Sequence, residues 1–219
     1  MKKNFFCVLL IFYFVLLSFN IAFADRMDNF LPEELKNLKL DMSIDEYNKN
    51  FPDAKLVVKD KCFVLYSLKI NKNDLWNTSA CYFDNDLLAF YSLLIIETGE
   101  NLLNKHFLNI DTEACILINK ISKSFGKINK KYIIENKDYN IYYEPLMVWE
   151  TDSFIVQISF TPYKILANVK TPVISLAFSK KGTDYSRFYR KIIEDNDKVT
   201  FDSLLSDEVK KALYNSTQK

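Results

Sequence analysis

Residues 154–160 read Phe-Ile-Val-Gln-Ile-Ser-Phe, and large apolar side chains occupy every second position of this segment. Successive side chains of an extended chain point to opposite sides, so the four alternate apolar residues would share one face of a strand. Ile155, Gln157 and Ser159 would lie on the other face. Residues 174–179 alternate in the same way. The two segments predict an antiparallel sheet with one face buried and the other in water.

Further runs rich in β-branched and aromatic residues predict the rest of the sheet. They are residues 56–58, 62–70, 76–83, 87–96 and 140–149. Asp84, Asn85 and Asp86 have the composition of a turn and predict a hairpin between the third and fourth runs. The turn at residues 150–153 would join the fifth run to the segment at 154–160.

Two helices have clear start and stop signals. Ser43 and Glu46 form a capping box, which predicts a short helix from Ile44 to about Asn50 before Pro52. A second helix would begin at a cap supplied by Asp111 or Thr112 and end at Gly126. Its apolar face would carry the residues that recur at helical spacing, namely Ala114, Leu117, Ile118, Ile121 and Phe125.

Two more helices are predicted near the end of the chain. An apolar stripe at helical spacing indicates the first of them, at Tyr185, Phe188, Tyr189, Ile192 and Ile193. Ser206, Asp207 and Glu208 would open the last helix, which carries Val209, Ala212 and Leu213.

The order helix, strands, helix, strands, helix, helix is typical of an α+β fold. We expect antiparallel sheets of hairpin-connected strands packed against several short helices in a single domain over residues 40–195. Residues 40–110 and 111–180 could be two loosely similar halves of it. Residues 25–39 would form a lead-in, and residues 196–219 a linker and the last helix.

Residues 1–24 have the order of a secretory signal peptide. Lys2 and Lys3 precede an apolar run from Phe5 to Phe19, and Ala22 and Ala24 provide the small residues before a cleavage point. An uncleaved anchor is the alternative, although the run is shorter than the roughly 20 residues that cross a bilayer. We expect a cleaved, exported protein, periplasmic or secreted, with no membrane span after cleavage.

Charge and composition exclude several classes of ligand. The chain carries 29 Lys or Arg and 28 Asp or Glu, whereas electrostatic binding of nucleic acid needs a clustered basic excess. Its three glycines leave no glycine-rich phosphate loop, and His106 is the single imidazole. We therefore expect no nucleic acid, nucleotide, cofactor or metal as a ligand.

Three cysteines would remain after removal of the signal peptide: Cys62, Cys81 and Cys115. In an exported protein an odd number is typical of one disulfide and one spare thiol. Cys62 and Cys81 lie in neighbouring predicted strands, so we expect the disulfide between them. Cys115 would be a buried thiol on the second helix.

Part of the chain resembles a known family. Leu40-Asp41-Met42-Ser43, Glu46-Tyr47 and Phe51-Pro52 are similar to the opening of exported α+β domains related to the outer-membrane assembly lipoprotein BamE (the SmpA/OmlA-like domains). Residues 117–126, followed by Trp149 and residues 154–160, resemble a second periplasmic pattern. Asp41 stands where the family usually has Gly, and the lipid-attachment cysteine is missing. The resemblance implies a non-enzymatic envelope module that works through protein contacts.

Aromatic and acidic side chains gather around the turn at residues 150–153. We expect Tyr142, Tyr143, Glu144, Trp149 and Glu150 to form a surface that binds another envelope protein, because aromatic residues are favoured at interface centres. The alternative is a small secreted hydrolase in which two of the carboxylates of Glu144, Glu150 and Asp152 act as an acid pair in a cleft. A structural or inhibitory module without a small ligand is the third interpretation.

Overall fold

The computed structural model describes residues 29–59, 63–69, 78–96, 109–136, 142–166, 169–183 and 191–215. These residues belong to two units, which meet between Lys39 and Leu40 in the sequence. The first unit contains a short 3₁₀ helix, η1 (Glu33–Leu35), with Leu35 buried. The predicted signal peptide, His106 and Cys62 lie outside the described residues.

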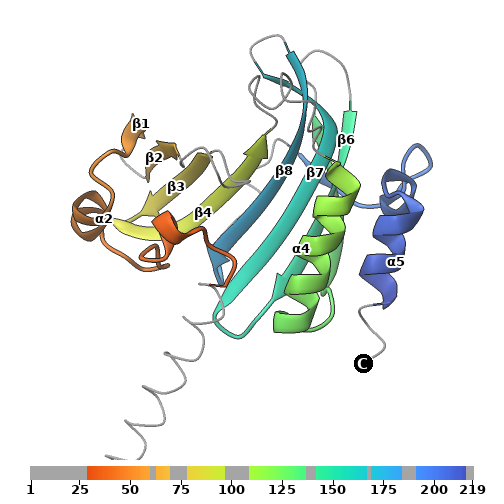
Figure 1. Cartoon of the computed structure of the whole chain (residues 1–219), viewed down its shortest axis with the longest axis horizontal. Helices are drawn as coiled ribbons and strands as arrows, with labels where there is room; N and C mark the ends of the chain where they lie inside the picture. Colours follow the sequence, from red (N-terminus) through yellow and green to blue (C-terminus); the bar gives the residue numbers. More distant parts are fainter. Residues whose placement is uncertain are drawn as a thin grey trace, which may run out of the picture. The chain divides into compact units, whose positions relative to one another are not determined.

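The second unit is built on a nine-stranded antiparallel sheet (Figure 1). The strands are β1 (Lys55–Lys59), β2 (Phe63–Lys69), β3 (Thr78–Asp84), β4 (Leu87–Ile96), β5 (Lys130–Asn136), β6 (Tyr142–Glu150), β7 (Phe154–Leu166), β8 (Val169–Lys180) and β9 (Ile192–Ile193). Their order across the sheet is β1-β2-β3-β4-β8-β7-β6-β5-β9. The predicted α+β class with antiparallel strands is therefore confirmed.

The sheet contains two runs of sequential strands that meet in its middle. Strands β1 to β4 follow one another across one part, and β5 to β8 follow one another in the opposite direction. The runs meet where β4 pairs with β8, with Tyr91 opposite Phe178 and Leu93 opposite Leu176. The predicted turn after β3 is present, because Asn85 and Asp86 both have positive φ in the two-residue loop to β4.

Three α-helices are described: α2 (Ile44–Asn50), α4 (Ile110–Phe125) and α5 (Asp207–Asn215). The Ser43 side chain accepts a hydrogen bond from the Glu46 amide and caps α2, as predicted. The cap of α4 differs from the prediction, because Asn109 accepts from the Thr112 amide at 3.1 Å. The chain is already helical at Asp111 and Thr112, so neither residue can occupy the non-helical cap position.

The two faces of the sheet differ in their neighbours. We call the helix face the one that carries the cross-strand row Tyr66, Cys81, Tyr91, Phe178, Val156 and Trp149. Tyr47 of α2 contacts this face, with its ring 5.2 Å from that of Phe83. Phe125 of α4 contacts the same face, edge-on to Phe154 at 5.5 Å. Figure 1 shows α4 lying beside β7.

The opposite face, which we call the small-residue face, was predicted to lie in water, and that prediction is wrong for the central strands. Gln157, Ser159 and Ser179 are all buried. The reason is that these polar side chains lie between two apolar clusters on their own face. One cluster contains Tyr82, Ala89, Phe90 and Ala177, and the other contains Ile134, Leu146, Val148 and Ile155.

Two segments near β5 also differ from the prediction. Ile192 and Ile193 were assigned to a helix, but they form β9 and pair with Ile134 and Ile133 of β5. Strand β5 itself was missed, because its apolar centre is short and charged residues occupy both ends of it. No helix in the described part of the chain is long and apolar enough to cross a membrane.

Candidate functional site

The predicted binding residues around the β6–β7 turn do not form one surface. Trp149 is completely buried on the helix face, where its row continues through Val156 and Phe178. Tyr142 and Tyr143 are half-buried at the other end of β6. Whether these residues bind a partner remains a prediction, but the indole of Trp149 is part of the core.

Glu144 is a buried carboxylate with a defined environment. Its Oε1 accepts a hydrogen bond from Nδ2 of Asn136 on β5 at 2.9 Å. The pKa of Tyr142 lies above its ordinary value because the phenol is partly buried and because Glu144 is close to it and accepts its hydrogen bond. The carboxylate thus links β5 to the start of β6.

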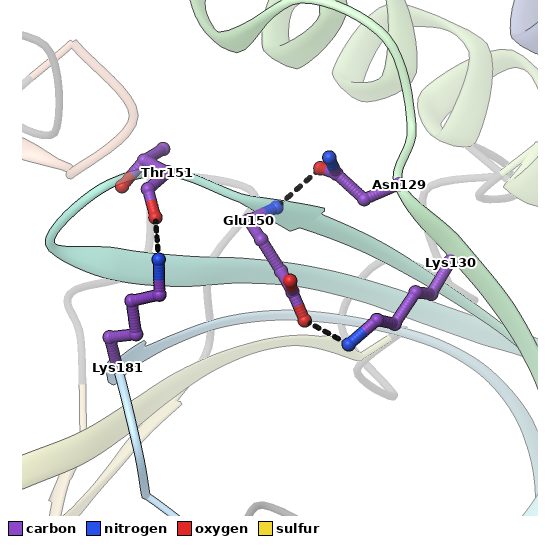
Figure 2. Close-up of polar contacts among 5 residues, drawn as sticks. All are labelled: Asn129, Lys130, Glu150, Thr151 and Lys181. Atoms are coloured by element: carbon purple, nitrogen blue, oxygen red, sulfur yellow. Dashed lines mark hydrogen bonds and ion pairs between the residues drawn. The ribbon is translucent and has the colours of Figure 1, made fainter.

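Glu150 takes part in a polar network at the β6–β7 turn (Figure 2). Its amide donates to Oδ1 of Asn129 at 2.5 Å, and its carboxylate pairs with Nζ of Lys130 at 2.5 Å. On the other side of the turn, Nζ of Lys181 donates to the carbonyl oxygen of Thr151 at 3.3 Å. These contacts hold β5, β6 and the end of β8 together around the turn.

The two glutamates of the hydrolase alternative lie far apart. Glu144 and Glu150 are six residues apart on the regular strand β6. At about 3.3 Å per residue they are separated by roughly 20 Å. Glycosidase carboxyl pairs are about 5–10 Å apart. The structure therefore does not bring these two carboxylates together as an acid pair.

Cys81 is a free, buried thiol on the helix face. Burial raises its pKa to about 12, and the nearby hydroxyl groups of Tyr47 and Ser79 offset part of this effect. Because Cys62 lies outside the described residues, the Cys62–Cys81 disulfide remains a prediction. Cys115 is half-buried rather than buried, and its pKa is raised by burial and by the nearby Glu208 and Asp111.

A groove between α4 and α5 has a volume of about 910 Å³. It is lined by Cys115, Asn119, Ser122, Lys123, Gly126, Glu208, Lys211, Ala212 and Asn215. The lining mixes both signs of charge with amides and offers no clear preference for one ligand. Among the described residues, no group of three or more His, Cys, Asp or Glu is placed to hold a metal ion.

The edge strand β1 exposes three adjacent apolar side chains. Leu56, Val57 and Val58 are 52%, 56% and 40% exposed. Only six large apolar side chains of the described residues are exposed, so half of them fall on this one strand. Adjacent exposed apolar side chains are a feature of interaction surfaces, so this strand is the candidate site.

The local structure of β1 explains why these side chains are exposed. β1 pairs with β2, and no described strand pairs with its outer edge. A bulge between Leu56 and Val58 leaves Val57 without a partner on β2. Lys55 and Lys59 stand at the two ends of the strand, a placement that protects exposed edges against aggregation.

Comparison of the chain with protein-family models, with curated proteins and with solved structures finds no match. The site at β1 thus rests on its own geometry. Residues 56–58 were predicted to form a strand, but not an edge strand. The signal that could have done so is the pattern Lys-Leu-Val-Val-Lys, in which lysines flank a short apolar run.

Proposed function

We propose that this chain is an exported envelope protein that acts as a non-catalytic binding module for another protein. The observation that carries the proposal is the exposed apolar segment Leu56–Val58 on the edge strand of a large sheet. A partner that covered these three side chains would gain roughly 1 kcal/mol from each, because about half of each side chain is still in water. Backbone groups at the edge of the strand would add directional contacts.

Export of the protein rests on residues 1–24, whose basic, apolar and small residues follow the order of a signal peptide. The resemblance to the BamE-related domains supports the same location. At Asp41, where that family usually has Gly, the backbone has a φ of 65°, a value that favours Gly. The position therefore has the backbone conformation that the family pattern would require.

The proposal includes an internal duplication. Helix α2 precedes the sequential strands β1 to β4, and α4 precedes β5 to β8. Both helices contact the helix face of the sheet. The antiparallel pairing of β4 with β8 would then join the last strands of the two halves.

The test compares two variants in which an equally exposed apolar residue is replaced by serine, one on β1 and one on α4. Leu56 on β1 and Ile116 on α4 are both 52% exposed, so serine at either position removes a similar apolar surface. Each tagged protein is recovered from gently solubilised envelope of the native organism and its bound proteins are measured by mass spectrometry. We expect a stoichiometric partner with wild type and with Ile116→Ser, and loss of it with Leu56→Ser. Recovery of no partner, or of equal amounts with both variants, would reject the proposal.

A further inference from the structure

We propose that the partner supplies an extended segment that pairs with the outer edge of β1 as an additional strand. The segment has an acidic residue at each end and two apolar residues between them. This inference rests on the proposed function and adds to it the mode of binding and the chemistry of the segment. Three features of β1 carry it: its open edge, its pattern of faces and its two lysines.

The open edge determines the mode of binding. β1 is bonded to β2 on one side, and its other side is not paired by any strand that the structure describes. All five of its residues are exposed, so no segment that the structure describes covers this edge against a further strand. In strand addition the main-chain hydrogen bonds supply affinity, and side chains on alternate faces supply specificity.

The bulge determines how the charges are arranged. Lys55 lies opposite Ser67 and Lys59 lies opposite Val64, so five residues of β1 match four residues of β2. Directly opposite residues share a face, and Ser67 and Val64 are three apart in a regular strand. The two lysines therefore point to opposite faces of the sheet.

An added strand must follow the same alternation. To place one carboxylate beside each lysine, its acidic residues must also point to opposite faces, which a spacing of three residues satisfies. The two residues between them then lie opposite Leu56 on the helix face and Val58 on the small-residue face. Apolar residues fit there, because Leu56 and Val58 are apolar and exposed.

Charge argues against a second copy of this chain as the occupant. A second β1 strand has lysine at both ends, so antiparallel pairing of two copies would bring four lysines and no carboxylate to the shared edge. The sequence also contains no four-residue stretch with two apolar residues between two acidic ones. The complementary segment must therefore come from another protein.

The test selects peptides from a displayed library of random eight-residue segments on the purified full chain. The same library is selected on Lys55→Glu/Lys59→Glu and on a control, Lys127→Glu/Lys198→Glu, in which two exposed lysines elsewhere are reversed. We expect wild type and the control to enrich peptides with two acidic residues three apart around an apolar pair. The β1 double variant should bind the best of these peptides about tenfold more weakly.

A second readout tests main-chain pairing without any change to the protein. Methylation of the two central backbone nitrogens of the selected peptide removes two donors and keeps the side chains, so we expect binding to be lost. Enrichment of no common pattern, equal binding to both double variants, or full binding of the methylated peptide would overturn the inference. Any of these results combined with loss of the native partner in Leu56→Ser would leave the proposed function standing.

Discussion

Asp41 has a φ of 65°, in the left-handed region where a side chain is strained. Its amide donates to the carbonyl oxygen of Leu88, and its carboxylate pairs with Nζ of Lys180 at 2.6 Å. Both charged groups are about half exposed, so the pair contributes little, in the range of about 0–1 kcal/mol. The left-handed backbone conformation, more than the ion pair with Lys180, therefore determines how much a substitution at Asp41 lowers stability.

Two substitutions at Asp41 separate the backbone from the charge. Asp41→Gly and Asp41→Ala both remove the pair with Lys180, but only Gly adopts the left-handed conformation without strain. We expect Asp41→Gly to be more stable than Asp41→Ala by about 0.5–1 kcal/mol in urea unfolding. Equal stabilities would show that the left-handed conformation is not maintained in solution.

Cys81 should make stability fall at alkaline pH. Burial raises the pKa of the folded thiol to about 12, whereas the unfolded thiol ionises near pH 8.5. Above that pH the unfolded chain holds fewer protons than the folded chain, so the free energy of unfolding decreases by up to about 1.4 kcal/mol per pH unit. The contribution of the buried thiol to the free energy of unfolding is fully present below pH 8.5 and is lost between pH 8.5 and pH 12.

The measurement is urea unfolding of wild type and Cys81→Ala from pH 8 to pH 10, before tyrosine ionisation dominates. We expect the difference in stability between the two proteins to shrink as the pH rises. Cys81 should also resist alkylation in the folded protein, while the half-buried Cys115 reacts. A constant difference, together with intact mass data showing Cys62 bound to Cys81, would establish the predicted disulfide in place of the free thiol.

At the scale of elements, substitutions at the start of α4 test which residue caps the helix. The Asn109 side chain accepts from the Thr112 amide, whereas Thr112 is itself exposed within the first turn. We expect Asn109→Ala to lower stability by about 1 kcal/mol and Thr112→Ala to change it by less than about 0.5 kcal/mol. A larger effect at Thr112 than at Asn109 in thermal or urea unfolding would contradict the assignment of the cap.

Trp149 of β6 was predicted to bind a partner, but it is part of the core. The side chain is completely buried, and its Nε1 has no hydrogen-bond partner among the residues that the structure describes. We expect Trp149→Ala to cost about 3–5 kcal/mol and Trp149→Phe to cost much less, because Phe retains most of the apolar volume and no hydrogen bond is lost. If Trp149→Ala unfolded at the same urea concentration as wild type, the residue would not be in the core.

At the scale of the whole molecule, local signals predicted most elements and missed their arrangement. The helix cap at Ser43, the turn at Asn85 and Asp86 and the last helix at Ser206 depend on neighbouring residues, and the structure confirms them. The pairing of β4 with β8 joins segments about 80 residues apart, and no local pattern specifies it. Ile192 and Ile193 fitted helical spacing equally well, because short apolar runs do not distinguish a helix from a strand.

At the candidate site too, local patterns predicted the secondary structure, whereas exposure and burial depend on contacts between distant segments. The residues of β1 were predicted to be extended, but their exposure follows from the order of all nine strands, which places β1 at an edge. Trp149 was expected on a binding surface because aromatic residues are favoured at interface centres. It is buried instead, because β6 is flanked by β5 and β7 and its helix face is part of the core.

The most direct test of the account is site-specific photocrosslinking in the native organism. A photoreactive phenylalanine derivative is placed at Val57 on β1 or at Ile116 on α4, which are 56% and 52% exposed. We expect illumination to yield one discrete protein adduct from position 57 and none of the same mass from position 116. No adduct at position 57, or the same adducts from both positions, would contradict the claim that β1 binds a protein partner.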